Sequence, residues 1–430
     1  MKVLLVGDGA REHILAEQLA RSCELYVAMG RRNPGIEKYS QKFFVCDFSN
    51  IEAIGGWAIR EKIDLALVTS EAAQARGLAD ALADAGIAPV SPLSAASAVG
   101  ENTAYAANLM VEAGIARPEF SVCKTQGDVA KAVAAMQHLV MKPAVRVDWK
   151  GTRLGDMDFR KKTDLIKEAK LLIKRHGSVL LEEWVDGESF SVQALSDGKN
   201  IALMPPVHAE RRALEEGGML TGGMGSYSTG KLLPFMRQAD MDYARGCMEK
   251  LVAIMRSKGV DYRGALCGRF MAAKRGTVMV DVYATFGGME TLNNLMLLRT
   301  QLVEVLTSIA DGSLAPASFQ EKATMVKYVV PEGYPDKPKR SAITVDERAL
   351  WNNGAKAYFE SVDVKPRGTF TTKERTLAIC ASGSTLEEAE AKAEAAASSI
   401  GGKVVHRKDI GGRDYVAREV KHVGMLRSGA

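Results

Sequence analysis

Short apolar runs alternate with helical patterns through the first hundred residues, and this alternation limits the possible folds more than any other feature. The runs KVLLV, ELYVAM, DLALVT and APVSP are each expected to form a strand, with helices between them. Strands that alternate with helices pair in parallel, because each helix carries the chain back across the sheet. We therefore predict an α/β protein whose residues 1–100 form a doubly wound parallel-sheet domain.

A different pattern begins after residue 100, where strand-like segments follow one another directly. HLVMKPAV and VLLEEWVDGESFSVQALSDGKNIALMP are expected to be strands, and ALCGRFMAAKRGTVMVDVYATF a hairpin. We predict a second domain over residues 101–322, with a subdomain at about 122–192. Short strands, a helix from Thr385 to Ile400 and a closing strand and loop at KVVHRKDIG predict an α+β domain over 323–430.

The composition excludes several classes of protein. Hydrophobic residues make up 47% and charged residues 25% of 430 residues, which is typical of a globular protein. The net charge of +5 is too small to indicate a nucleic-acid or membrane surface. The cysteines are scattered without a CxxC pair, which argues against a zinc ribbon. The opening MKVLLVGDG reads as a strand and turn, not a signal peptide. We expect a cytoplasmic protein that acts on small molecules.

The turn after the first apolar run, Gly7-Asp8-Gly9-Ala10-Arg11-Glu12-His13, is a candidate phosphate site. A glycine-rich turn between a strand and a helix exposes backbone N–H groups at the positive end of the helix. It lacks the third glycine of a dinucleotide-binding fingerprint. A plain tight turn explains these residues equally well, and Asn33-Pro34-Gly35 is by itself also a turn.

Two lysines and an acidic strand end are candidates for holding a nucleotide. Lys142 ends an apolar strand and Lys150 follows in a turn, so the two can clamp a polyphosphate, although a single lysine is more often a solvated charge. The segment Leu181-Glu182-Glu183-Trp184-Val185, with Glu188 after it, can offer backbone groups to an adenine and a carboxylate to a ribose. An edge strand with a charged end is the alternative interpretation.

Two further segments can carry chemistry. In Thr221-Gly222-Gly223-Met224-Gly225 each glycine costs backbone entropy, so a loop whose backbone approaches a ligand explains them better than packing does. Asp281 on a predicted strand and Glu290 on the following loop can hold Mg²⁺ if they face one cleft. An isolated pair of acids at this spacing is common.

In this order, these segments resemble the phosphoribosylamine–glycine ligase family over nearly the whole chain. GDGAREH is similar to the family's opening G-S-G-G-R-E-H, NPGI is unchanged, and LEEWVDGESFSVQ, TGGMGSYS and KATMVKYVVPEGYP resemble later segments. The resemblance implies a central ATP-grasp domain, with ATP and Mg²⁺ as cofactors. In this family ATP phosphorylates the glycine carboxylate, and the amine of phosphoribosylamine attacks the acyl phosphate to give an amide. We expect a monomer or homodimer.

The resemblance also implies roles for individual residues. The expected catalytic residues are Arg212, Asp281 and Glu290, and Asp281 and Glu290 would also hold the metal. The expected nucleotide-binding residues are Lys142, Lys150, Glu182, Glu183, Val185 and Glu188. The expected substrate-binding residues are Gly9, Arg11, Glu12, Asn33, Pro34, Gly35, Glu71, His208, Thr221, Gly222, Gly223, Met224 and Gly225.

Several positions depart from the family's pattern, and the departures cluster where chemistry is expected. The family's metal-binding Glu and Asn in E-F-N-x-R-F-G-D-P-E correspond to Asp281 and Tyr283. The Arg and Asp of the same segment correspond to Thr285 and Gly288. Losing a hard oxygen ligand should weaken Mg²⁺ binding, because Mg²⁺ demands near-octahedral oxygen geometry. Losing the Arg and Asp should weaken capture of an amino acid, whose two charges need opposite partners.

Two hypotheses remain open on the sequence alone. In the first, the chain is an ATP-dependent ligase that joins an amino acid-like carboxylate to phosphoribosylamine or to another amine. In the second, it is a non-catalytic paralogue that binds a nucleotide, a phosphoribosyl ligand or a partner protein. The retained Lys142, Lys150 and Glu188 and the TGGMG loop at 221–225 favour continued ATP binding.

Overall fold

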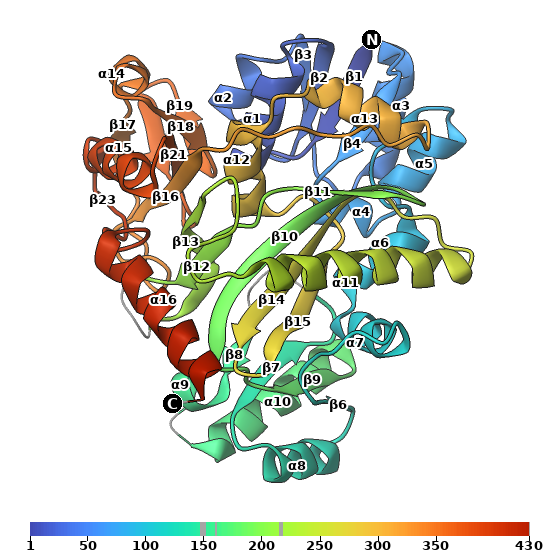
Figure 1. The fold of residues 1–430 in the computed structure, drawn as a ribbon. Coiled ribbons are helices and arrows are strands. Elements are labelled where there is room, and N and C mark those ends of the chain that lie inside the picture. Colours follow the sequence, from blue (N-terminus) through green and yellow to red (C-terminus); the bar gives the residue numbers. More distant parts are fainter. Residues whose placement is uncertain (147–151, 160, 215–217, 430) are drawn as a thin grey trace.

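The computed structural model describes residues 1–146, 152–159, 161–214 and 218–429. Figure 1 shows a sheet with its helices at one end, a smaller sheet with helices at the opposite end, and a long curved sheet between them. The C-terminal region lies beside the N-terminal one, and its last helix runs along the middle of the molecule (Figure 1). No helix in these described ranges is both long enough and apolar enough to span a membrane.

The N-terminal sheet is parallel throughout, as the alternating pattern predicted. Its order is β3 (Lys42–Val45), β2 (Glu24–Met29), β1 (Lys2–Val6), β4 (Leu65–Val68) and β5 (Ala88–Pro89). Val3 and Leu5 pack on the α1 side, while Leu4 and Val6 pack on the opposite side, so both faces of β1 are buried. The edge strand β3 was not predicted, because KFFV is short and mostly exposed.

Two antiparallel sheets form the central region. The middle sheet has the order β11 (Ile201–Leu203), β10 (Gly187–Asp197), β14 (Arg263–Ala273) and β15 (Gly276–Tyr283). The lid sheet has the order β6 (Phe120–Cys123), β9 (Val179–Glu183), β7 (Leu139–Pro143) and β8 (Arg153–Leu154). Helices α8 (Gln126–Ala135) and α10 (Lys162–His176) bury apolar residues against the lid sheet. The predicted hairpin around KRG is present as β14 and β15.

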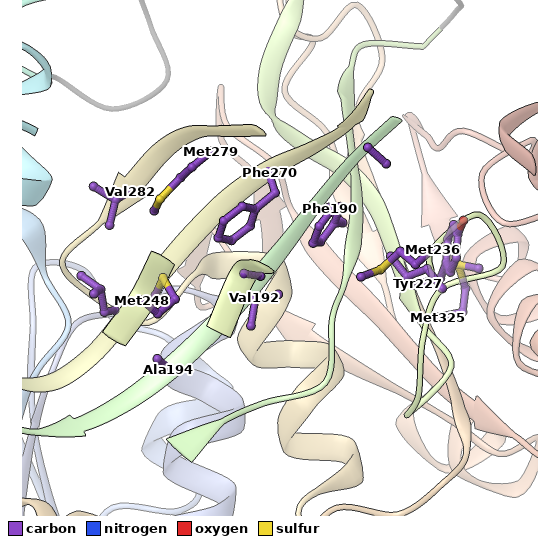
Figure 2. Close-up of a cluster of buried hydrophobic side chains, with 14 of the residues drawn as sticks. Phe190, Val192, Ala194, Tyr227, Met236, Met248, Phe270, Met279, Val282 and Met325 are labelled. Atoms are coloured by element: carbon purple, nitrogen blue, oxygen red, sulfur yellow. The ribbon is translucent and has the colours of Figure 1, made fainter. Parts of the chain in front are cut away.

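The middle sheet is held by a hydrophobic core on one face. Figure 2 shows Phe190 and Phe270 next to each other on neighbouring strands, and their ring centroids lie 5.4 Å apart. Met248 of α11 (Gln238–Ser257) packs on the same core. A Cβ atom on Gly268 would lie 2.7 Å from the Met248 sulfur, so α11 packs closely on β14 there. This packing fixes the strands that carry Arg269 and Asp281.

A fourth sheet joins the central region to the C-terminal one. The order is β12 (His208–Arg212), β13 (Leu220–Ser228), β16 (Ala323–Pro331), β21 (Leu377–Gly383) and β18 (Ala355–Phe359), with β23 (Val404–Val405) paired to β16. Because β13 and β16 pair across the predicted boundary at residue 322, the sheet is continuous there. The domain limits therefore stay predictions.

The glycine-rich segment 221–225 lies in strand β13, so the expectation of a loop is wrong. A Cβ atom on Gly225 would lie 2.8 Å from the carbonyl oxygen of Val326 on the paired strand. Gly223 has φ +120°, and a Cβ there would lie 2.1 Å from the Met289 methyl carbon. The glycines at 223 and 225 are therefore explained by close packing against protein atoms.

The C-terminal region holds a small sheet and two long helices. The sheet has the order β19 (Val362–Lys365), β20 (Gly368–Thr371), β17 (Ala342–Thr344) and β22 (Gly401–Gly402). The predicted helix near 385–400 is α15 (Leu386–Ser398), capped by Thr385. The chain does not close on a strand and loop as predicted, because α16 (Arg413–Ser428) follows.

The remaining helices mostly surround these sheets. They are α1 (Ala10–Leu19), α2 (Pro34–Glu37), α3 (Ile51–Glu61), α4 (Glu71–Gln74), α5 (Leu78–Asp84), α6 (Ser94–Glu101), α7 (Thr103–Glu112), α9 (Gly155–Asp158), α12 (Gly288–Leu297), α13 (Leu302–Ala310) and α14 (Glu347–Asn352).

Candidate active site

Three cavities lie in a row and share lining residues. The inner cavity, about 220 Å³, lies between the lid sheet and the middle sheet. The outer cavity, about 470 Å³, lies between the first turns of the N-terminal sheet, α12 and the C-terminal region. A connecting cavity of about 50 Å³ shares Lys142 and Arg269 with the inner cavity and Arg146 and Tyr283 with the outer one. Arg211 lines all three, so the cavities lie next to one another.

The inner cavity contains most of the residues predicted to bind a nucleotide. Those that line it are Lys142, Glu182, Glu183, Val185 and Glu188, together with Arg212. The Lys142 Nζ lies 2.5 Å from the Glu182 carboxylate and donates to the carbonyl of Val280 at 2.9 Å. The lysine is therefore fixed between the two sheets. Lys150 lies outside the described residues.

Helix α16 closes one side of the inner cavity. Tyr415 lines the cavity and donates a hydrogen bond to Glu210 at 3.0 Å. His422 lies 2.6 Å from Glu188, the carboxylate predicted to contact a ribose. The guanidinium of Arg427 binds Asp240 of α11 at 2.5 Å. These contacts tie the last helix of the chain to the nucleotide side of the site.

His208, predicted to contact substrate, lies in the wall of the inner cavity and not in the outer one. Its Nδ1 lies 2.7 Å from the carbonyl of Ser189, and its Nε2 lies 3.0 Å from Glu419 of α16. Burial alone would lower the pKa of His208, but the Glu419 carboxylate and these hydrogen bonds raise it to about 9. The imidazolium therefore joins β12 to α16, and the substrate role stays a prediction.

The connecting cavity is strongly cationic. Its charged lining residues are Lys142, Arg146, Arg211, Arg269 and Asp281. The Asp281 carboxylate lies 2.5 Å from the Arg146 guanidinium and 3.9 Å from Lys142. Burial opposes ionisation of Asp281, but the charges of Arg146 and Lys142 hold its pKa well below the usual range.

Tyr283 supports this cluster from one side. The guanidinium carbon of Arg146 lies 4.0 Å from the centre of the Tyr283 ring, within the range of a cation–π contact. Arg269 is paired in register with Asp281 on the neighbouring strand. Arg146 is therefore fixed by a carboxylate on one side and an aromatic ring on the other.

The side chains around Asp281 do not fit a magnesium site. Asp281 lines the connecting cavity and Glu290 lines the outer cavity, so the expected pair does not share one cavity wall. One Asp281 oxygen already accepts from Arg146 and from the Val282 N–H at 3.0 Å. Across residues 1–146, 152–159, 161–214 and 218–429, no three His, Cys, Asp or Glu side chains are grouped to hold a metal. Mg²⁺ in such sites is usually held by one or two carboxylates together with substrate phosphates, and here the two expected carboxylates face different cavities, with Asp281 already bound to an arginine.

The outer cavity mixes arginines and acids. Of the residues predicted to bind substrate, Gly9, Arg11, Glu12, Asn33, Glu71 and Gly222 line it, and Thr221 lines the connecting cavity. Pro34, Gly35, Gly223, Met224 and Gly225 line none of the three cavities. Gly35 lies against the His13 ring, where a Cβ atom would overlap, so it serves packing.

Several predicted substrate residues hold the first turn in shape. Arg11 donates to the carbonyl of Phe286 at 2.6 Å and to that of Thr69 at 2.7 Å. Glu12 accepts from the Gly9 N–H at 2.8 Å. The Asn33 amide donates to Phe359 of the C-terminal region at 2.8 Å. These side chains join three parts of the chain around the outer cavity.

The start of α1 faces an acidic group from the C-terminal region. The Ala10 N–H donates to Glu360 at 2.9 Å, and Glu360 also binds Arg375 at 2.6 Å. Burial, and secondly the Glu12 carboxylate, raise the pKa of Asp8 to about 6. A phosphate bound at this helix end would therefore meet Asp8 and Glu360 as well as the nearby arginines.

Sequence reasoning missed several residues of these cavities. They are Arg31, Arg146, Arg211, Arg269, Glu360, Arg375 and Tyr415, and His422 beside Glu188 was also missed. Arg31 follows the second predicted strand at the same sheet edge as Gly9, which is a signal that was present. Glu360 and Arg375 approach Ala10 and the 222–223 backbone over long sequence separations, which no local pattern indicates.

Comparisons with known proteins agree with this arrangement. Phosphoribosylglycinamide synthetase family models match residues 1–100 (N domain), 101–291 (ATP-grasp domain) and 324–413 (C domain). Phosphoribosylamine–glycine ligase from Pyrococcus abyssi is 37% identical over 431 residues, covering 98% of this chain and 97% of that protein. The enzyme of that name from Methanoregula boonei is 37% identical, covering 99% of this chain and 100% of its own. This chain belongs to the phosphoribosylglycinamide synthetase family.

Solved structures show the fold of this family member independently. Phosphoribosylamine–glycine ligase from Thermotoga maritima superposes with a TM-score of 0.81 at 21% identity, covering 95% of this chain and 100% of that one. The MgADP-bound biotin carboxylase domain of 2-oxoglutarate carboxylase from Hydrogenobacter thermophilus gives 0.74 at 14% identity, covering 99% and 98%. The predicted α/β class with a central ATP-grasp domain is therefore confirmed.

Proposed function

We propose that this protein is an ATP-dependent carboxylate–amine ligase that forms an amide through an acyl phosphate, joining glycine to phosphoribosylamine. The observation that carries the proposal is the cationic connecting cavity, which shares lining residues with the inner cavity on one side and the outer cavity on the other. A phosphoryl group moving from a nucleotide to a carboxylate needs adjacent binding sites, with positive charge where the group passes.

The nucleotide is assigned to the inner cavity. Val140 and Val185 supply apolar walls for a base, and Glu188 supplies a carboxylate for a ribose hydroxyl. Lys142 stands where the inner and connecting cavities meet, which places its ammonium beside the phosphates. The lysine is buried, so its charge is weakly screened and acts strongly on a nearby phosphate.

An amino acid is assigned to the junction of the outer and connecting cavities. Arg211 and Glu290 lie 3.9 Å apart there, and the nearer Glu290 oxygen has no hydrogen-bond partner among the described residues. A buried acceptor without a partner is costly unless a ligand satisfies it. Arg211 would bind the carboxylate of glycine and Glu290 its ammonium group, which leaves the carboxylate facing the connecting cavity.

The phosphoribosyl amine is assigned to the rest of the outer cavity. Arginines from the N-terminal and C-terminal regions, Arg31 and Arg375, line it near the start of α1. A guanidinium group can bind two oxygens of one phosphate, which fixes a phosphorylated sugar with its amine toward the acyl phosphate.

We also propose that Mg²⁺ binds more weakly at Asp281 and Tyr283 than at an acid–amide pair, because Tyr283 supplies only a phenol.

The hypothesis of a non-catalytic paralogue has no supporting observation. Among the described nucleotide candidates, Lys142 and Glu188 both line the inner cavity, and the relatives matched over the full chain are named ligases. A different carboxylate or amine remains the alternative substrate choice, because Thr285 and Gly288 stand where the family has Arg and Asp.

The test is ADP release from ATP with glycine and freshly generated phosphoribosylamine, with each component omitted in turn. Release that requires both substrates supports the proposal. Release with glycine replaced by another amino acid would move the assignment to that carboxylate. Absence of release with any pair, in a sample that binds ATP, would contradict ligase activity. Lys142→Met should lower ATP affinity at least about tenfold, while Glu182 keeps its 2.9 Å partner Arg117.

A further inference from the structure

The connecting cavity holds more positive than negative charge. Its lining has four cations, Lys142, Arg146, Arg211 and Arg269, and one carboxylate, Asp281. Other nearby acids are Glu182, which is shared between Lys142 and Arg117, Glu290, at 3.9 Å from Arg211, and Glu71, whose charge acts on Arg146. Counting these, five cations face four carboxylates. Buried charge without a counter-charge costs several kcal/mol per ion, so the cluster is suited to an anionic ligand.

Two of the guanidinium groups have unused donors. The Nε atoms of Arg146 and Arg211 are buried and find no hydrogen-bond partner in the described part of the chain. The Arg146 side chain is 8% exposed, and its terminal nitrogen already binds Asp281. Buried donors are almost always satisfied, and exceptions point to a missing ligand or water. An anion bound against these two arginines would supply the missing acceptors.

Contacts with Arg146 explain both differences from the family's pattern, at Asp281 and at Tyr283. Asp281 is a shorter acid than the family's glutamate and binds the Arg146 guanidinium directly. Tyr283, which stands where the family has an amide, provides the ring on which that guanidinium lies. Both side chains that would otherwise face a metal therefore face an arginine.

We propose that the Arg146 guanidinium, fixed between Asp281 and Tyr283, binds the terminal phosphates of the nucleotide and neutralises the charge that a divalent cation would otherwise carry there. This inference rests on the proposed function. Arg269, Lys142 and Arg211 complete the phosphate site from the other walls of the connecting cavity. A guanidinium can bind two oxygens of one phosphate and stays charged at all working pH values, so it can stabilise a transferring phosphoryl group. Nucleotide binding then does not depend on a metal held by Asp281.

The first experiment uses the unaltered protein and calorimetric titration with ATP, ADP and AMP, each in Mg²⁺ and in EDTA. We expect ATP and ADP to bind in EDTA with dissociation constants within about threefold of those in Mg²⁺. Loss of ATP and ADP binding in EDTA, with AMP binding kept, would overturn the inference, because the phosphates would then need the metal.

The second experiment tests Arg146 directly. Arg146→Met keeps the aliphatic packing on Tyr283 and removes the charge, and Arg299→Met, at an exposed surface arginine, is the matched control. We expect Arg146→Met to weaken ATP and ADP by at least tenfold in EDTA and to leave AMP unchanged, while Arg299→Met has no effect. Equal ATP affinity in wild type and Arg146→Met would overturn the inference.

The two proposals fail in different ways. If ADP release never depends on an amine and a carboxylate, but ATP binds without metal and through Arg146, the ligase proposal fails and the phosphate site stands. If release depends on both substrates but ATP binding requires Mg²⁺, the ligase proposal stands and the arginine site fails. If Arg146→Met does not fold, the EDTA titration of wild type still decides the question.

Discussion

His422 lies 2.6 Å from Glu188, although 234 residues separate them in the chain. His422 belongs to α16, and Glu188 is the second residue of the long strand β10 that borders the inner cavity. The same imidazole lies 3.2 Å from Asp186, and these two acids raise the pKa of His422 against the effect of burial. The last helix of the chain thereby fixes the carboxylate that we assign to the ribose.

The first prediction concerns this contact. His422→Ala should weaken ATP binding about three- to tenfold, because a partly exposed hydrogen bond of this kind contributes about 0.5–1.5 kcal/mol and Glu188 would lose its fixed orientation. Calorimetric titration with ATP measures the change. The exposed neighbour Lys421→Ala is the control and should bind as wild type does. Tighter binding in His422→Ala would show that the histidine competes with the ribose.

The second prediction separates two glycines by their surroundings. Gly225→Ala should destabilise the protein by about 1–3 kcal/mol, because its Cβ would press on the Val326 carbonyl across β13 and β16. Gly246→Ala, in the middle of α11 with open space around it, should stabilise by about 0.5–1 kcal/mol. Thermal unfolding of both variants gives the two shifts. Equal shifts of one sign would contradict the packing explanation.

The sequence predicted the parts of the site that depend on local pattern. Lys142 and Glu188 could be placed because each stands at an end of a strand with a clear apolar run. The cationic cluster could not be predicted, since Arg146 and Asp281 meet only when the lid and middle sheets face each other. The segment at 221–225 was wrongly expected to be a loop, because glycines occur both where a ligand approaches the backbone and where strands pack closely, and a single sequence does not distinguish the two. Helix α16 was missed, although RDYVAREVKHVGMLRS is long enough for four turns.

The third prediction uses the raised pKa of Asp8. Above pH 6 the Asp8 carboxylate is charged and repels a phosphate at the start of α1, whereas below pH 6 it is neutral. Asp8→Asn should therefore bind ribose 5-phosphate about three- to tenfold more tightly than wild type at pH 7.5, and equally at pH 5. The phosphate of the ligand also titrates over this range. Its effect cancels when the affinities of wild type and Asp8→Asn are compared at the same pH. The same affinity ratio at both pH values would contradict an Asp8 pKa near 6.

The fourth prediction concerns stability and His208. The folded pKa of about 9 lies above the usual 6.5, so the folded state keeps a proton that the unfolded state releases between these values. This stabilisation is complete below pH 6.5 and is lost as the pH rises through about 9, amounting to about 3 kcal/mol at most. The thermal midpoint should fall between pH 6.5 and 9 in wild type. In His208→Gln the thermal midpoint at pH 6.5 should be lower than in wild type. Its decrease between pH 6.5 and 9 should be smaller than in wild type. His176→Gln, at the end of α10, should keep the wild-type profile. An unchanged profile in His208→Gln would show that the Glu419 pair does not hold α16.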